Sequence, residues 1–185
     1  MQYEVQVIET EAELTAVIRH TLLRSEVRHN LLTPSITEVL QTLARQGLKP
    51  GGPVFSRHLT LDPYFFDFEI GVPVDVSFQP AGRVVASTLP TATVARVLHQ
   101  GPYEGLAGAW TRLREEIARA GLFPGDELWE CYLTGPAESA DPACWYTELY
   151  QPLDTTVPRS TPRPRDASYP EVMPSLRPSR TSERA

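Results

Sequence analysis

The chain has 185 residues, of which 41% are hydrophobic, so it is long enough for one domain with a buried core. Its 17 basic and 23 acidic residues give a net charge of -6, which argues against direct nucleic-acid binding. No apolar stretch approaches the roughly 18 residues of a membrane span, and the first residues are acidic, unlike those of a signal peptide. We therefore expect a cytoplasmic protein with no membrane partner.

The first half of the chain predicts four strands and one helix. Short segments of alternating apolar and polar residues indicate the strands. Thr33 is the predicted N-cap of the helix, with Pro34 in its first turn. We expect strands near Val5 to Ile8, Leu14 to Arg19, Val54 to Leu59 and Phe65 to Val74, and the helix at Ser35 to Gln46.

The second half predicts the same succession of elements. An alternating segment from Val84 to Leu98 is interrupted by Pro90, and Gly101-Pro102 precedes a helix. That helix carries an apolar stripe at helical spacing, formed by Leu106, Trp110, Leu113 and Ile117. The last two strands are expected at Leu128 to Thr134 and Tyr146 to Leu153, with a polar loop between them.

The two halves also repeat in sequence. GLKPGGPVFSRH from position 47 resembles GLFPGDELWECY from position 121, and DFEIGVPV around Glu69 resembles YTELYQPL around Glu148. Repetition of so long a unit indicates a duplication. We predict an α+β domain over residues 1–153, with halves of about 1–77 and 82–153. It consists of two strand-helix-strand-strand units, related by a pseudo-twofold axis, whose antiparallel sheets form a central ligand groove.

Residues 154–185 differ in composition from the rest of the chain. They are rich in Pro, Ser and Arg and have almost no apolar periodicity, which is typical of disordered segments. Six Arg against two Asp and two Glu give this tail a charge of +2, which leaves -8 on residues 1–153. We interpret the tail as a solvated extension.

Acidic and aromatic residues alternate along the predicted strands. Glu130 and Tyr132 share one face of their strand, as do Glu148 and Tyr150 of the next, because successive side chains point to opposite faces. If the two strands pair as a hairpin, all four could line one surface. The repeat adds a matching surface in the first half, formed by Ser56, His58, Asp67 and Glu69.

Such a surface would have acidic walls and aromatic sides, which favours aromatic cations. A solvated sheet face carries the same residue types, so the pattern alone leaves both interpretations open. His58 also fits a structural histidine, and no ligand spacing supports a metal or another cofactor. Trp110 is predicted in the core. Cys131 is predicted to pack inward as a free thiol without a nucleophilic role.

Four motifs, in order, resemble the signatures of GyrI-like domains, the effector-binding modules of AraC-type and MerR-type regulators. They are FEIGVPV from Phe68, HQGPYEGL from His99, ECYLTGP from Glu130 and WYTELYQPL from Trp145. The resemblance covers roughly the first 153 residues. It implies a duplicated α+β unit with a central ligand groove and Glu148 as the acidic residue deep in that groove. The aromatic neighbours it implies are Tyr103, Tyr132, Trp145 and Tyr150.

The resemblance implies a binding module for hydrophobic, aromatic, preferably cationic small molecules, which would serve sequestration or sensing of drugs or toxins. Because the predicted ligand domain begins almost at the first residue, we expect no helix-turn-helix reader of DNA here, and the resemblance implies a stand-alone member of the family. One alternative is a hydrolase that opens strained cyclopropane rings of DNA-alkylating natural products, with Glu130 and Glu148 as the two catalytic carboxylates. A second alternative is an inhibitor of a protein partner of the DNA gyrase type.

Overall fold

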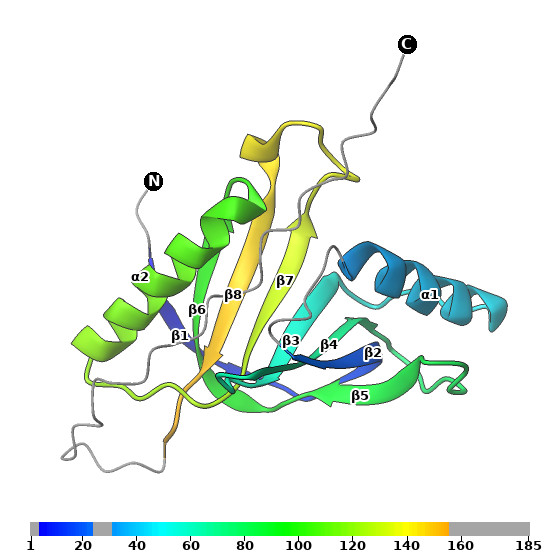
Figure 1. The fold of residues 1–185 in the computed structure, drawn as a ribbon, viewed down its shortest axis with the longest axis horizontal. Helices are drawn as coiled ribbons and strands as arrows, with labels where there is room; N and C mark the ends of the chain where they lie inside the picture. Colours follow the sequence, from blue (N-terminus) through cyan, green and yellow to red (C-terminus); the bar gives the residue numbers. More distant parts are fainter. Residues whose placement is uncertain (1–3, 24–30, 156–185) are drawn as a thin grey trace.

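The computed structural model describes residues 4–23 and 31–155, and within them eight antiparallel strands form one sheet on which two α-helices pack (Figure 1). In chain order the elements are β1 (Gln6–Thr10), β2 (Glu13–Leu23), α1 (Leu32–Arg45), β3 (Val54–Thr60), β4 (Phe65–Pro73), β5 (Val85–Leu89), β6 (Ala92–Gln100), the 3-10 turn η2 (Tyr103–Gly105), α2 (Leu106–Arg119), β7 (Leu128–Thr134), the 3-10 turn η3 (Pro142–Cys144) and β8 (Tyr146–Pro152). The predicted α+β class is confirmed. The predicted tail lies outside the described residues, except for its first two.

The strand order shows the duplication. It is β1-β6-β8-β7-β3-β4-β2-β5, and it reads the same in reverse when β1 to β4 are interchanged with β5 to β8. The first strand of each half is exchanged, because β1 pairs with β6 and β5 pairs with β2. The two predicted sheets are thus one continuous sheet in which each half completes the other.

The pseudo-twofold axis passes between the central strands. β3 and β7 pair antiparallel, with Ser56 directly opposite Glu130. These two positions are separated by 74 residues, the same offset as the repeated Gly-Leu motifs at Gly47 and Gly121. Ser56 and Glu130 are therefore both cross-strand partners and equivalents in the repeat.

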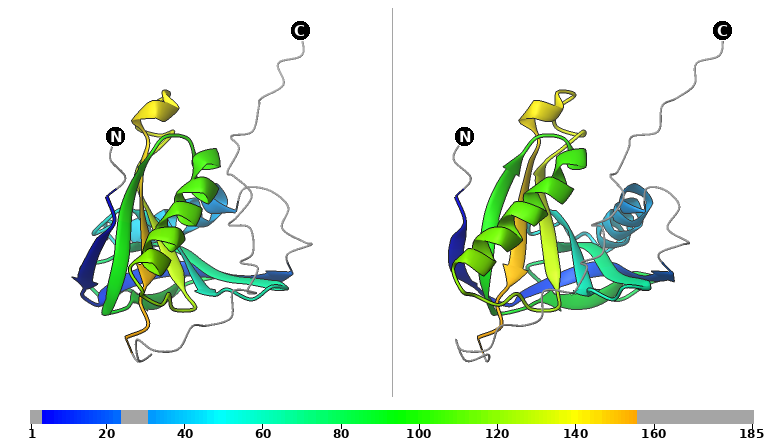
Figure 2. Two further views of the ribbon diagram at one scale, coloured as in Figure 1. Left: turned by 90° about the vertical axis from the view of Figure 1, so that its left-hand side faces the viewer. Right: turned by 60° about the vertical axis from the view of Figure 1, so that its left-hand side comes forward.

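The sheet curls into a half-barrel (Figure 2). Links of two residues join β1 to β2 and β5 to β6, although these strands lie near opposite ends of the strand order. Such short links require the two ends of the sheet to approach each other. Pro90 lies in the second link, where a residue without an N–H group interrupts no strand pairing.

Both helices cover the same face of the sheet, which we call the helix face. Val39 and Leu43 of α1 pack in a cluster with Ile18 and Val72, and Leu113 of α2 packs in a second cluster on the other half. α1 starts at Leu32, earlier than predicted, and Thr33 lies within the helix and is not its cap. The earlier start has a packing reason, since Leu32 contacts apolar clusters of both halves.

The opposite face lies inside the curl and is also apolar. Its cluster contains Val17, Phe55, Leu89, Val94 and Trp129, which come from strands of both halves. They meet because the sheet curls around them. Neither α-helix in the described part of the chain has the length and apolar character that a bilayer crossing needs.

Candidate functional site

A buried polar cluster lies on the helix face beside the pseudo-twofold axis. Glu130 of β7 is 4% exposed, and its Oε1 accepts a hydrogen bond of 2.6 Å from Nε1–H of Trp110 on α2. Its Oε2 accepts a bond of 2.8 Å from the hydroxyl of Tyr132. That hydroxyl lies 3.0 Å from Oγ of Ser56 on β3. We call these four residues the Glu130 cluster.

Local sequence explains how the cluster forms. Alternation along β7 places Glu130 and Tyr132 on one face, as predicted, and in the structure this is the helix face. The apolar stripe of α2 places Trp110 on the same side of the molecule. Trp110 is a core residue, as predicted, but its bond to Glu130 was not foreseen. The available signal was that a buried indole N–H group needs a hydrogen-bond acceptor.

In the described part of the chain, the hydrogen-bond donors to the carboxyl group of Glu130 are the neutral Trp110 and Tyr132. Among residues 4–23 and 31–155, no lysine or arginine forms an ion pair with it. Burial raises the pKa of Glu130, and the bonds from Trp110 and Tyr132 oppose that rise in part. Burial and the nearby Glu130 carboxyl also raise the pKa of Tyr132, so this phenol stays neutral. A buried carboxylate without a positively charged partner is stabilised when it binds either a proton or a cation.

Aromatic rings extend the Glu130 cluster along the second half of the helix face. The ring of Tyr103 in η2 lies 5.5 Å from that of Tyr132 and 5.0 Å from that of Trp145, between centroids. All three rings are buried, and burial raises the pKa of Tyr103 to about 12. The structure therefore brings together three aromatic residues of the predicted site with Glu130.

His58 lies on the same face in the first half. It follows Ser56 by two positions on β3 and is the repeat equivalent of Tyr132. Its ring is buried and lies 5.9 Å and 5.7 Å from the rings of Phe66 and Phe68. At equivalent positions of the repeat, the first half thus has a serine and a histidine where the second half has a glutamate and a tyrosine.

Glu148 and Tyr150 do not join this site. On β8, Glu148 is paired with Cys131, whereas Glu130 is paired with Leu149. Directly paired residues share a face, so Glu130 and Glu148 lie on opposite faces of the sheet. Glu148 forms an ion pair of 3.1 Å with Arg96 and accepts a bond of 2.6 Å from the Tyr150 hydroxyl. The expectation that the two glutamates share a surface is wrong.

Tyr150 and Cys131 belong to the opposite face. The Tyr150 ring stacks on Trp129 at a centroid distance of 5.3 Å. Burial raises the pKa of the Cys131 thiol to about 12, so the thiol is protonated at neutral pH. Cys131 packs on the side of Trp129, as predicted.

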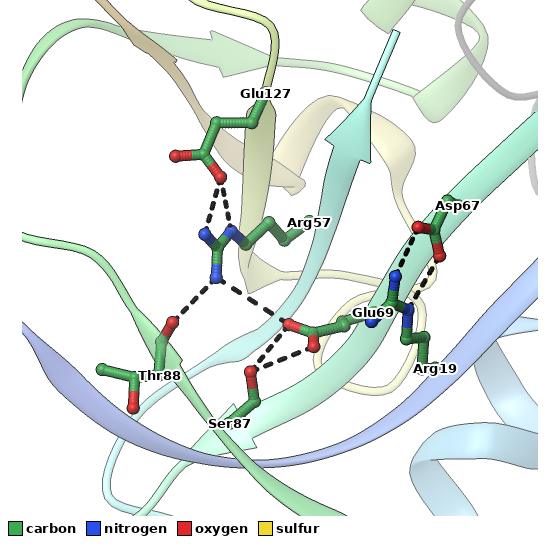
Figure 3. A network of polar contacts seen from close by, with 7 residues as sticks. All are labelled: Arg19, Arg57, Asp67, Glu69, Ser87, Thr88 and Glu127. Atoms are coloured by element: carbon green, nitrogen blue, oxygen red, sulfur yellow. Dashed lines mark hydrogen bonds and ion pairs between the residues drawn. The ribbon is translucent and has the colours of Figure 1, made fainter. Parts of the chain in front are cut away.

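Glu69 also lies on the opposite face, since it pairs with Arg57 on β3. It accepts hydrogen bonds from the hydroxyl of Ser87, and its Oε2 lies 3.9 Å from Nη1 of Arg57 (Figure 3). Asp67, on the same side of β4, binds Arg19. The surface predicted for the first half is therefore divided. Ser56 and His58 face the helices, whereas the two acidic residues belong to polar networks on the other face.

Several solved structures share this fold. The EcmrR C-terminal domain matches with a TM-score of 0.65 and 20% identity, over 83% of this chain and 99% of that one. SAV2435 bound to tetraphenylphosphonium matches with a TM-score of 0.54 and 15% identity, over 84% of this chain and 95% of that one. A hydrolase encoded by lin2189 from Listeria innocua matches with a TM-score of 0.55 and 12% identity, over 82% of this chain and 92% of that one.

This chain corresponds to only about half the length of one longer protein of known structure, EcmrR. In the EcmrR–DNA complex the match has a TM-score of 0.68 and 22% identity, and it covers 82% of this chain but 57% of that one. No curated protein matches the sequence. The sequence profile of the GyrI-like small molecule binding domain matches residues 3–154. Together with the duplicated fold, this match shows that the chain belongs to the GyrI-like small molecule binding domain family.

Proposed function

We propose that this chain binds hydrophobic, aromatic, preferably cationic small molecules on the helix face, with Glu130 as the anionic group. The observation that carries the proposal is the buried Glu130 carboxyl, which has neutral donors and neighbouring aromatic rings but no arginine or lysine partner among the described residues. Such binding would serve sequestration or sensing of drugs or toxins.

The physical basis is charge complementarity in a poorly hydrated site. A cation near a buried carboxylate gains more Coulomb energy than it would in water, because the surroundings screen the charges less. The faces of Tyr132, Tyr103 and Trp145 add cation–π attraction of about 0.5–2 kcal/mol for each ring that the cation reaches. Tetraphenylphosphonium, the compound in the SAV2435 structure, combines a single positive charge with four apolar rings and is therefore a suitable probe.

The test is a titration of wild type and of Glu130→Gln with tetraphenylphosphonium, in which calorimetry or tryptophan fluorescence measures binding. We expect the variant to bind the cation at least about tenfold more weakly, roughly 1.4 kcal/mol, because the amide has the same shape but no charge. The affinity of the neutral analogue triphenylphosphine oxide should change much less.

Two further glutamate variants make the assignment specific. Glu115→Gln removes one negative charge from the exposed side of α2 and controls for net charge. Glu148→Gln tests the competing assignment from sequence, and we expect near-wild-type cation binding because Glu148 is paired with Arg96 on the opposite face. Equal cation affinities of wild type and Glu130→Gln would contradict the proposal, and a loss confined to Glu148→Gln would transfer the site to the other face.

The hydrolase alternative in its two-carboxylate form has no support from the geometry. Glu130 and Glu148 are separated by the sheet and cannot act on the same bound molecule. The similarity to the Listeria innocua hydrolase is one of fold alone, at 12% identity.

A further inference from the structure

The Glu130 cluster is a hydrogen-bond chain that ends at Ser56. Oε2 of Glu130 lies 2.8 Å from the Tyr132 hydroxyl, which lies 3.0 Å from Oγ of Ser56. Each of the last two groups can donate or accept. The direction of the chain is therefore not fixed by the positions of its heavy atoms.

With Glu130 ionised, the chain runs towards the carboxylate. The Ser56 hydroxyl donates to Tyr132, the Tyr132 hydroxyl donates to Oε2, and Trp110 donates to Oε1. With Glu130 protonated on Oε2, the order reverses: Glu130 donates to Tyr132, and Tyr132 donates to Ser56. The bond from Trp110 to Oε1 is unchanged. Both protonation states therefore keep the same three hydrogen bonds without movement of a heavy atom.

We propose that Glu130 exchanges its proton for the ligand, so that each cation bound at the Glu130 cluster releases one proton. This inference rests on the proposed function and adds how the site is regulated. The balance is one protonated Glu130 plus one free cation on one side, and one carboxylate–cation pair plus one proton taken up by solvent on the other. The site is neutral before and after exchange, so neither state leaves an uncompensated buried charge.

The surroundings favour the protonated form when no cation is present. Burial raises the pKa of Glu130. The neighbouring phenols do not titrate in the same range, because burial raises the pKa of Tyr103 to about 12 and that of Tyr132 in the same direction. The other titratable or charged groups nearby are His58 on β3, Glu138 beside Tyr103, and Arg114, whose guanidinium lies 5.7 Å from the Trp110 ring centroid.

The first test counts protons. Calorimetric titrations of tetraphenylphosphonium in buffers of different ionisation enthalpy measure the protons released per cation bound. Below the pKa of Glu130 we expect a release close to one, and cation affinity should rise about tenfold per pH unit before it levels off above that pKa. Triphenylphosphine oxide should release no proton. Glu130→Gln should bind both probes with no proton release and no pH dependence in this range.

A second variant tests the hydrogen-bond chain. Tyr132→Phe removes the donor to Oε2, which disfavours the carboxylate and should move the rising part of the affinity profile to higher pH. A purely structural effect would weaken binding equally at every pH. Without ligand and below the pKa of Glu130, the infrared carbonyl band of a protonated carboxyl should be present in wild type, absent in Glu130→Gln, and lost from wild type when the cation binds.

The outcomes separate the inference from the function beneath it. Binding of tetraphenylphosphonium that depends on Glu130, but with a flat pH profile and no proton release, would overturn proton exchange and leave the proposed function standing. No binding of tetraphenylphosphonium at any pH would overturn both.

Discussion

Replacing Trp110 by alanine is expected to lower the free energy of unfolding by about 3–5 kcal/mol, the usual cost of removing a fully buried tryptophan. The side chain is 0% exposed and packs in the core cluster between α2 and the sheet, with Leu106, Leu113 and Leu128. The substitution would leave a cavity there and remove the hydrogen bond to Oε1 of Glu130. Urea denaturation followed by far-UV circular dichroism measures the change.

Trp110→Phe separates packing from the hydrogen bond. Phenylalanine keeps most of the apolar contact but has no N–H group, so Glu130 loses one of its two donors. We expect Trp110→Phe to lower the free energy of unfolding by about 1–3 kcal/mol. For the alanine variant, a decrease in the free energy of unfolding of less than about 1 kcal/mol would show that α2 contributes little to the core.

The polar network on the opposite face should show the second large effect, through Arg57. This side chain is 13% exposed and donates two hydrogen bonds to Glu127, at 2.9 and 2.6 Å, and one of 2.7 Å to the Thr88 carbonyl oxygen (Figure 3). It thereby links β3 to β5 and to the residue that precedes β7. Arg57→Met should lower the free energy of unfolding by about 2–3 kcal/mol, because it leaves partly buried carboxylates without their cation. The partial exposure of Glu127 keeps the value below that of a fully buried pair.

Arg83 supplies the matched control. It also pairs with a glutamate, Glu38, but its side chain is 59% exposed. Arg83→Met should cost at most about 1 kcal/mol. The double variant Arg57→Met/Glu127→Gln should recover part of the loss. If Arg57→Met and Arg83→Met destabilise equally, the network of Figure 3 contributes no more than a surface ion pair.

The sequence alone was sufficient for features that repeat along the backbone. Alternation in β7 placed Glu130 and Tyr132 on one face, and helical spacing placed Trp110 in the core. Each prediction depends only on the period of one strand or helix. The repeated motifs likewise predicted the pseudo-twofold, which the strand order confirms, since duplicated sequences adopt duplicated structures.

Tertiary structure decided which of these faces meet. Whether Glu148 lies beside Glu130 depends on the register between β7 and β8, and a shift by one residue moves a side chain to the other face. That register follows from the long connection before Tyr146 and an irregularity between Tyr132 and Thr134, which no local pattern encodes. The exchange of β1 and β5 between halves is equally non-local. The chain's own alternation therefore determined that Glu130 and Tyr132 share a face, and only the tertiary structure placed that face under the helices and separated Glu130 from Glu148.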